Sequence, residues 1–428
     1  MALVLGGLLV GCQPGARQTD GITHLTLWQG VNPPPNRDVL DTLVRQFNAT
    51  HSTIQVESLY VGQSDQQMPK ILAAIVGNAP PDLLWYAPMI TGQLVELEAL
   101  RSLDDWLETT AGRDQIDPAL LESMQWEGHT WSIPFGTNNV AIFYRPSLFE
   151  AAGIDTLPQT WDELRQTAQT LTIPSRNQHG MLLPLGKGEW TVFTWLPFMW
   201  SGGGELVAEP GDAASDAAPP VVQIDNEGAI AALHLWQDLM TDGSVVLSQP
   251  ERGYELDGFL AGRVAMQLTG PWTLGQLAAT DVDYGVMPIP TGARRATVVG
   301  GENLFVFRST PEREQAALTF AEYVLSAEFQ TQWAIGTGYL PVNLRSRDRP
   351  DYQTFVAQQP AVEVFVEQAP YGRSRPIFPG YNRISDNLGR AIEAVLLGKA
   401  TPEGALAESQ QRLDLALGGD RPTASQRP

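Results

Sequence analysis

Cysteine is almost absent from the sequence, which has one, Cys12, in 428 residues. A single thiol forms no intramolecular disulfide, and a chain of this length can bury enough apolar surface without one. Beyond the first dozen residues there is also no run of about 18 uncharged apolar residues, the length that a membrane-spanning helix needs. Basic residues are outnumbered by acidic ones, 27 to 48, and the net charge of −21 argues against nucleic acid as a partner.

Motifs for catalysis or metal binding are lacking as well. The segment GMLLPLGKGE has five residues between Gly180 and Gly186, where a phosphate-binding loop requires four. A nucleophile elbow requires glycine two residues before its serine, whereas Met199 stands two residues before Ser201 in MWSGGG. We therefore expect Ser201 to be a turn residue. The paired carboxylates Asp104 and Asp105 lie in a predicted surface segment, where we expect them to be solvated. No metal-ligand spacing links the five histidines, which are His24, His51, His129, His179 and His234.

The lone cysteine lies directly behind an apolar run. Residues 1–11 are apolar or glycine, too short to span a bilayer but of the length found in a signal peptide. The ending LVGC resembles a bacterial lipobox, in which the cysteine receives a diacylglycerol and becomes the first mature residue. We therefore expect a signal peptide at 1–11, a lipid anchor at Cys12 and a tether at 12–21. The alternative is a buried strand ending in a chance cysteine. No basic residue precedes Cys12, which places the expected true start upstream of Met1.

From residue 22 the apolar pattern alternates between strand and helix periods, as in a mostly parallel α/β sheet. Strands are predicted at 22–28, 53–61 and 82–86, with helices at 37–51 and 68–76 between them. The segment 130–154 predicts two strands paired around a turn and then a helix, and Thr160 with Glu163 predicts a helix capping box. Further helices are predicted at 226–241, 311–335, 384–397 and 402–416, and a surface loop at 209–220.

Aromatic, amide and glycine residues gather where the predicted strands end. Clefts in α/β proteins are built at such ends, so these residues are candidates for a ligand site. The sequence also has twelve tryptophans, more than a core requires, and exposed aromatic faces are a common way to bind sugar rings. The candidates are Trp28, Tyr86, Asn138 in GTNNV, Trp272 in GPWTLG, and Gly301 with Glu302 in GGEN.

At these residues the chain resembles the extracellular solute-binding proteins of bacterial ABC importers, specifically the family for sugars and glycerol phosphates. The matching segments keep their order from about residue 22 to 416. After the opening strand and helix they are ILAAIVGNAPPDLLWY, IPFGTNNVAIFYRPSLFEAAGIDTLPQTWDEL, FLAGRVAMQLTGPWTLGQL, YGVMPIPTGARRATVVGGENLFVF, GTGYLPVN and SRPIFPGYNRISDNLGRAIEAVLLGKATPEGAL.

The resemblance implies an α/β fold of the two-lobed, class II periplasmic-binding-protein type, with a hinge that lets the lobes close on a ligand. Under this reading the N-terminal lobe comprises 22–134 with 282–337, and the C-terminal lobe comprises 135–281 with 338–428. The implied ligand-binding residues are Trp28, Tyr86, Gly301 and Glu302, facing Asn138, Trp190, Trp272, Tyr339 and Arg375.

Three alternatives stay open for these residues. Trp190 could belong to the apolar stretch WTVFTWLPFMW, in which Trp195 and Trp200 are expected to be core. Tyr339 could pack a hinge without touching ligand. The carboxylate of Glu302 could pair with a helix start instead of accepting two sugar hydroxyls.

Two classes of ligand fit the resemblance. The segment RPIFPGYNRIS has Ile377 and Phe378 where the glycerol-phosphate branch has an arginine between small residues. This favours a neutral di- or oligosaccharide such as trehalose or maltose, or glucosylglycerol. Arg373, Arg375 and Arg383 leave glycerol 3-phosphate or a glycerophosphodiester open.

The implied protein is a monomeric, non-catalytic lipoprotein without a cofactor. It would lie at the outer face of the cytoplasmic membrane, in the periplasm where there is one, and deliver its ligand to an ABC permease. A competing class is a secreted glycoside hydrolase with two cleft carboxylates, which would turn its substrate over. A third is a surface scaffold or sensory partner, which no small solute would stabilise.

Overall fold

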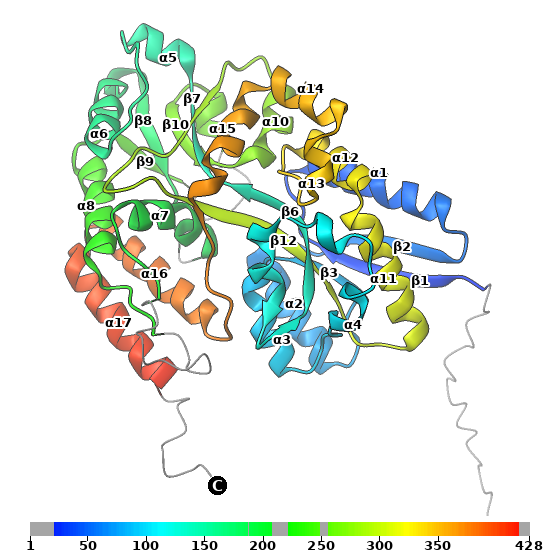
Figure 1. Ribbon diagram of the computed structural model, residues 1–428. Helices are drawn as coiled ribbons and strands as arrows, with labels where there is room; N and C mark the ends of the chain where they lie inside the picture. The colour runs from blue at the N-terminus through cyan, green and yellow to red at the C-terminus, as the bar shows by residue number, and fades with distance from the viewer. Residues whose placement is uncertain (1–20, 187, 208–220, 249–255, 419–428) are drawn as a thin grey trace, which may run out of the picture.

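Two β-sheets, joined by strands that cross between them, divide the chain into two α/β lobes (Figure 1). The computed structural model describes residues 21–186, 188–207, 221–248 and 256–418. Cys12, the segment 1–11, most of the tether and the loop expected at 209–220 lie outside the described residues. No helix among the described residues has the length and apolar character needed to cross a bilayer.

The sheet of the first lobe has six strands in the order β13-β12-β3-β1-β2, with β6 also paired to β12. The strand β1 is parallel to both β2 and β3, whereas β12 is antiparallel to β3 and β6. The strands are β1 (Thr23–Gln29), β2 (Ile54–Tyr60), β3 (Leu83–Tyr86), β6 (Ser132–Asn139), β12 (Thr297–Val306) and β13 (Gly372–Arg373).

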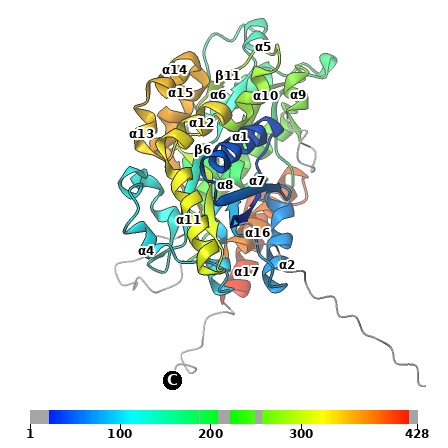
Figure 2. The same ribbon diagram turned by 90° about the vertical axis from the view of Figure 1, so that its right-hand side faces the viewer.

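Helices of the first lobe include α1 (Pro34–Thr50), α2 (Ser64–Val76), α3 (Thr91–Glu96), α4 (Asp104–Leu107), α11 (Pro311–Leu325) and α12 (Ala327–Thr337). The turned view shows α1, α11 and α12 on the near side of the molecule, with α7 and α8 behind (Figure 2). A short hairpin, β4 (Gln125–Trp126) with β5 (His129–Thr130), and the helices α13 (Leu344–Arg347), α14 (Pro350–Gln358) and α15 (Pro360–Gln368) complete the connections.

The sheet of the second lobe has five strands in the order β11-β7-β10-β8-β9. They are β7 (Ala141–Tyr144), β8 (His179–Leu183), β9 (Val245–Leu247), β10 (Val264–Thr269) and β11 (Gly285–Met287). The helices are α5 (Pro146–Ala151), α6 (Trp161–Thr170), α7 (Glu189–Ser201), α8 (Glu227–Thr241), α9 (Asp257–Leu260), α10 (Leu274–Ala278), α16 (Tyr381–Leu396) and α17 (Pro402–Gly418).

Most predicted elements are present because their apolar faces find a core. The first three predicted strands and two predicted helices correspond to β1, β2, β3, α1 and α2, and the capping box of Thr160 and Glu163 is formed. The segment 311–335, predicted as one helix, is two. They meet at Ser326, whose hydroxyl accepts a hydrogen bond from the Phe329 amide and begins α12.

The strand pair predicted in 130–154 is wrong. The strands β6 and β7 are separated only by Val140, yet they lie in different sheets: β6 pairs with β12, and β7 pairs with β10 and β11. The chain runs straight on instead of turning back, and both strands pair with partners outside the segment. It therefore crosses from one lobe to the other at Val140.

Two short strands also pair across the expected lobe boundaries. The strand β11 lies in the segment 282–337 expected in the first lobe but pairs with β7 of the second sheet. Conversely, β13 lies in the segment 338–428 expected in the second lobe but pairs with β12 of the first sheet. Strand pairing thus assigns these two strands to the opposite lobes, as it does residues 135–139 of β6, which lie in the segment expected in the second lobe but pair with β12 of the first sheet. The other boundaries remain a prediction.

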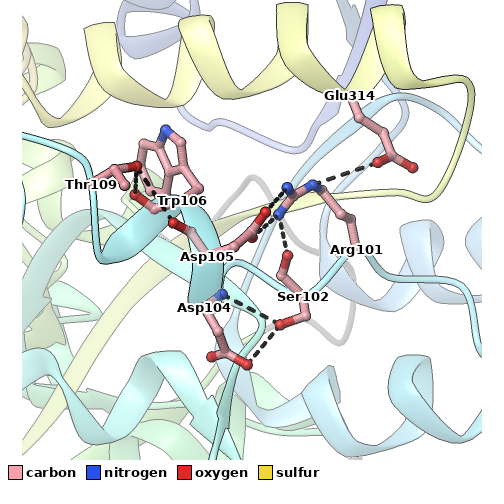
Figure 3. A network of polar contacts seen from close by, with 7 residues as sticks. All are labelled: Arg101, Ser102, Asp104, Asp105, Trp106, Thr109 and Glu314. Carbon is pink, nitrogen blue, oxygen red and sulfur yellow. Dashed lines mark hydrogen bonds and ion pairs between the residues drawn. The ribbon is translucent and has the colours of Figure 1, made fainter.

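The paired carboxylates of α4 form ion pairs and hydrogen bonds at the surface (Figure 3). The Arg101 guanidinium donates to both oxygens of Asp105, at 2.9 and 2.8 Å, and its Nε lies 3.5 Å from a carboxylate oxygen of Glu314 on α11. Asp104 accepts a 2.7 Å bond from the Thr130 amide. Burial acts to raise the pKa of Asp104, but the hydrogen bonds, first among them that of Thr130, leave it below its ordinary value. These contacts tie α4 to α11 and to the hairpin.

The pairing of β6 with β12 contains a bulge. Its register shifts between Glu302, which opposes Gly136, and Asn303, which opposes Pro134. The preceding Gly301 has φ 116°, a conformation open essentially to glycine alone, and a Cβ there would lie 2.2 Å from the Gly136 carbonyl oxygen. The bulge therefore depends on glycine and sets the direction of the Glu302 side chain.

We predict that Gly301→Ala lowers the free energy of unfolding by at least about 2 kcal/mol, because both the φ angle and the close contact oppose a methyl group. The matched control is Gly128→Ala. Gly128 also has a positive φ, 78°, but a Cβ there meets nothing within 4 Å, so the cost is about 1 kcal/mol. Urea denaturation of both variants measures the difference. Equal losses would show that the bulge tolerates a side chain.

Candidate ligand-binding site

A cleft of about 510 Å³ lies between the two lobes. From the first lobe it is lined by Gly30, just after β1, and by Tyr86, the last residue of β3. From the second lobe it is lined by Trp272, which follows β10, and by the first turn of α7, which follows β8. The cleft thus lies at the carboxyl ends of parallel strands in both sheets, where α/β folds place their ligands.

The structure brings eight of the nine predicted residues to this cleft. They are Tyr86, Asn138, Trp190, Trp272, Gly301, Glu302, Tyr339 and Arg375. Trp28 is not among the residues that line it. Side chains alternate along β1, and Trp28 packs instead against a small apolar cluster that contains Ile71 of α2 and Leu84 of β3.

Aromatic rings form one wall of the cleft, with Trp272 at its centre. The ring centroid of Trp272 lies 6.0 Å from that of Trp190 at an interplanar angle of 71°. It lies 6.4 Å from the centroid of Phe193 and 6.4 Å from that of Tyr339. Trp190 and Trp272 are half-buried and line the cleft.

The tryptophans of α7 divide as the sequence predicts. Trp195 and Trp200 are 0% and 2% exposed and lie in the core of the second lobe. Trp190, in the first turn of the same helix, lines the cleft. The helix is buried nearly all round beyond that turn, so its beginning is the part that can reach a ligand.

A chain of hydrogen bonds links three predicted residues. The Tyr339 hydroxyl donates to Oε2 of Glu302 at 3.3 Å, and Asn138 forms a side-chain hydrogen bond with Tyr339. Burial raises the pKa of Tyr339 well above its ordinary value, as does the charge of Glu302, so the phenol stays protonated. The Oδ1 atom of Asn138 is buried, and none of the described residues forms a hydrogen bond with it. Tyr339 also packs against Trp333 of α12, with the ring centroids 5.4 Å apart, and it lines the cleft as well.

The carboxyl group of Glu302 is in an unusual electrostatic environment. Burial raises its pKa to about 7, although the charge of Arg375 and the bond from Tyr339 act to lower it. Only one of its two oxygens accepts a hydrogen bond from the described residues. The predicted pairing with a helix start is absent: Glu302 lies within β12 and its described partner is a phenol.

A second carboxylate, Glu189, lines the cleft and is not evident from the sequence. Its Oε1 accepts 2.6 Å and 2.8 Å bonds from Nη1 of Arg375 and the hydroxyl of Tyr381, and its Oε2 accepts from the hydroxyl of Ser385. The Arg375 guanidinium also lies 4.5 Å from the ring centre of Phe193, one turn further along α7. In the sequence, Glu189 is marked only as an acidic residue directly before a tryptophan. This position does not reveal its three hydrogen-bond partners, which lie nearly 200 residues further along the chain.

The described residues contain no group of three or more His, Cys, Asp or Glu placed to hold a metal ion. Of the cleft carboxylates, Glu189 is engaged by three side-chain donors and Glu302 by one. The arrangement suits the binding of a polyhydroxylated molecule, with rings to stack against and acceptors for hydroxyl groups.

Solved structures of similar fold include two sugar-binding receptors. An ABC transporter solute-binding protein of Thermotoga lettingae bound with α-D-tagatose is 25% identical, with a TM-score of 0.81, and the match covers 92% of this chain and 100% of that one. The cyclic α-maltosyl-1,6-maltose binding protein of Arthrobacter globiformis is 26% identical, with a TM-score of 0.75, over 93% of this chain and 100% of that one.

Characterised and uncharacterised sequences match as well. A putative binding protein of Brucella abortus is 27% identical over 71% of this chain and 70% of its own length. The sn-glycerol-3-phosphate-binding periplasmic protein UgpB of Escherichia coli is 23% identical over 96% of this chain and 95% of its own length.

The family profile described as bacterial extracellular solute-binding protein matches residues 42–363, most of the chain. Together with the two-lobed fold and the cleft, this match confirms the family that the sequence motifs indicate. The chain belongs to the bacterial extracellular solute-binding proteins.

Proposed function

We propose that this protein is the receptor of an ABC importer and captures a small neutral carbohydrate in the cleft between its lobes. Trehalose, maltose and other di- or oligosaccharides, or glucosylglycerol, are the candidate ligands. Lobe closure around the ligand would create the form that the permease recognises. The observation that carries the proposal is the pairing of an aromatic wall around Trp272 with the hydrogen-bond chain from Asn138 to Glu302.

The aromatic wall supports a carbohydrate ligand. Trp190 and Trp272 meet edge to face, so a sugar ring stacked on one indole would have its edge against the other. The free oxygen of Glu302 and the unpartnered Oδ1 of Asn138 are acceptors for hydroxyl hydrogens. Sugars have both apolar faces and hydroxyl donors, so they match a cleft with an aromatic wall on one side and hydrogen-bond acceptors on the other.

The charges of the cleft support a neutral ligand. The buried cation, Arg375, is already paired with Glu189 at 2.6 Å. Two more carboxylates, Glu302 and Asp386, line the same cleft. Among the described residues that line the cleft there is no second cation, so within this set a phosphate group would meet repulsion that no uncommitted cation offsets. The relation to the glycerol-phosphate-binding relative makes a phosphate ester the alternative that an experiment must test.

Titration calorimetry of residues 22–428 against trehalose, maltose, glucosylglycerol, glycerol 3-phosphate and glycerophosphocholine tests the proposal. We expect stoichiometric binding of a neutral member without any change in the sugar. Cleavage of a sugar during incubation would indicate a glycoside hydrolase instead. If only the phosphate compounds bind, the ligand is a glycerol phosphate or a glycerophosphodiester and not a neutral carbohydrate.

We predict that Trp272→Ala weakens binding of the neutral ligand at least tenfold, about 1.4 kcal/mol, because it removes the central ring of the wall. Trp106→Ala is the matched control: Trp106 is half-buried on α4 and does not line the cleft. Calorimetry of both variants gives the comparison. If the two lose affinity equally, or neither does, Trp272 does not contact the ligand.

We predict that the affinity for the neutral ligand rises with pH. Burial raises the pKa of Glu302 to about 7, so the carboxylate forms as the pH rises through that value. Hydroxyl donors bind the ionised form more tightly, and the gain between pH 6 and pH 8 is up to about tenfold. Glu302→Gln has no such ionisation, and its affinity should be the same at both values. A wild-type affinity that is flat or falls over this interval would contradict direct acceptance by Glu302.

We also propose that Cys12 carries a lipid that holds the receptor at the outer face of the cytoplasmic membrane, beside its permease. The prediction is that the wild-type protein takes up labelled palmitate and sediments with membranes when it is expressed in a bacterium. Cys12→Ser should do neither, because the acylated sulfur is gone. Palmitate labelling of the Cys12→Ser protein would locate the modification elsewhere.

A further inference from the structure

The carboxylate of Glu189 lies where two helices of the second lobe begin. Glu189 is the first residue of α7, and Tyr381 and Ser385 come from the first turns of α16. Helix N-termini favour negative charge, because their free amides and the helix dipole point toward it. The three side-chain donors Arg375, Tyr381 and Ser385 converge on the same carboxylate.

We propose that Glu189 determines the class of ligand by filling the cleft's own anion-binding position. In the wild-type protein an internal carboxylate neutralises Arg375 and takes up the hydroxyl donors, so an anionic solute finds the position occupied. This inference rests on the proposed function only in taking the cleft as the ligand site.

The burial of Arg375 makes an anionic partner obligatory. The residue is 8% exposed, and its Nε has no hydrogen-bond partner among the described residues. A buried guanidinium without a counter-charge destabilises a protein far more than an exposed one does. Removing the negative charge at position 189 would therefore leave a cation and two hydroxyl donors facing a cleft that is wide enough for a phosphate ester.

The other cleft carboxylates do not replace Glu189 in this role. Glu302 acts on Arg375 through its charge without a hydrogen bond to it. Asp386 is exposed and pairs with Arg390, one turn further along α16. Among the described carboxylates of the cleft, Glu189 is the one that is hydrogen-bonded to the guanidinium.

The test compares glycerol 3-phosphate and inorganic phosphate binding by wild type and Glu189→Gln, using calorimetry in a phosphate-free buffer. Glutamine keeps the shape of the side chain and removes its charge. We expect the variant to bind at least one of the two probes at least tenfold more tightly than wild type. Asp386→Asn is the matched control, since it removes one charge from the same cleft without freeing Arg375, and we expect no such gain.

A second variant tests whether Arg375 is the group that binds the anion. In the double variant Glu189→Gln/Arg375→Gln the gain should disappear, because the guanidinium that receives the phosphate is gone. A gain that persists there, or that is equally large in Asp386→Asn, would overturn the proposal, since general repulsion in the cleft would then explain it. A folded Glu189→Gln variant with no gain would overturn it as well.

Wild type alone supplies a further measurement that does not depend on the stability of the variants. We expect 10 mM phosphate to leave its melting temperature unchanged, and a rise would overturn the proposal by showing that Glu189 does not exclude the anion. Failure of the proposed function looks different: no neutral carbohydrate would bind wild type, while a gain of phosphate binding by Glu189→Gln would still support the role of Glu189.

Discussion

The pairing of β6 with β12 is the constraint on which the rest of the structure depends. Both strands belong to the first sheet, yet the chain leaves β6 at Val140 to enter the second sheet directly, and Thr297 at the start of β12 donates to the Val140 carbonyl oxygen. The two lobes are thus connected by a pair of hydrogen-bonded strands. The bulge at Glu302 lies in this pair, so the same feature that joins the lobes also positions a carboxylate in the cleft.

Local sequence patterns predicted much of the fold and of the cleft, because strand ends and helix starts are local features. Trp272 behind its Gly-Pro turn and Glu302 behind two glycines could be placed at strand ends without knowing what they face. Three features could not be predicted this way. The separation of β6 from β7 depends on strand partners that are distant in the sequence. The location of Trp28 outside the cleft depends on which side of β1 faces the cleft. The role of Glu189 depends on donors from α16 and from the segment before it.

The excess of carboxylates in the cleft agrees with the acidic composition of the chain, but these carboxylates lie in different surroundings. The protein is strongly acidic, and the described residues that line the cleft include more carboxylates than cations. Two of these carboxylates differ in their surroundings. Glu189 is held by three donors, whereas burial raises the pKa of Glu302 to about 7 with a single hydrogen bond from Tyr339. In the proposed function the first organises the site internally, and the second accepts hydrogen bonds from the ligand.

We propose that the protein captures its ligand by closing the two lobes that line the cleft. The central claim is that a neutral carbohydrate drives this closure. Small-angle X-ray scattering of the protein with and without a saturating neutral disaccharide or glucosylglycerol tests it most directly. The account predicts a smaller radius of gyration with the ligand that calorimetry identifies. An unchanged scattering curve at full saturation, or contraction with glycerol 3-phosphate alone, would contradict it.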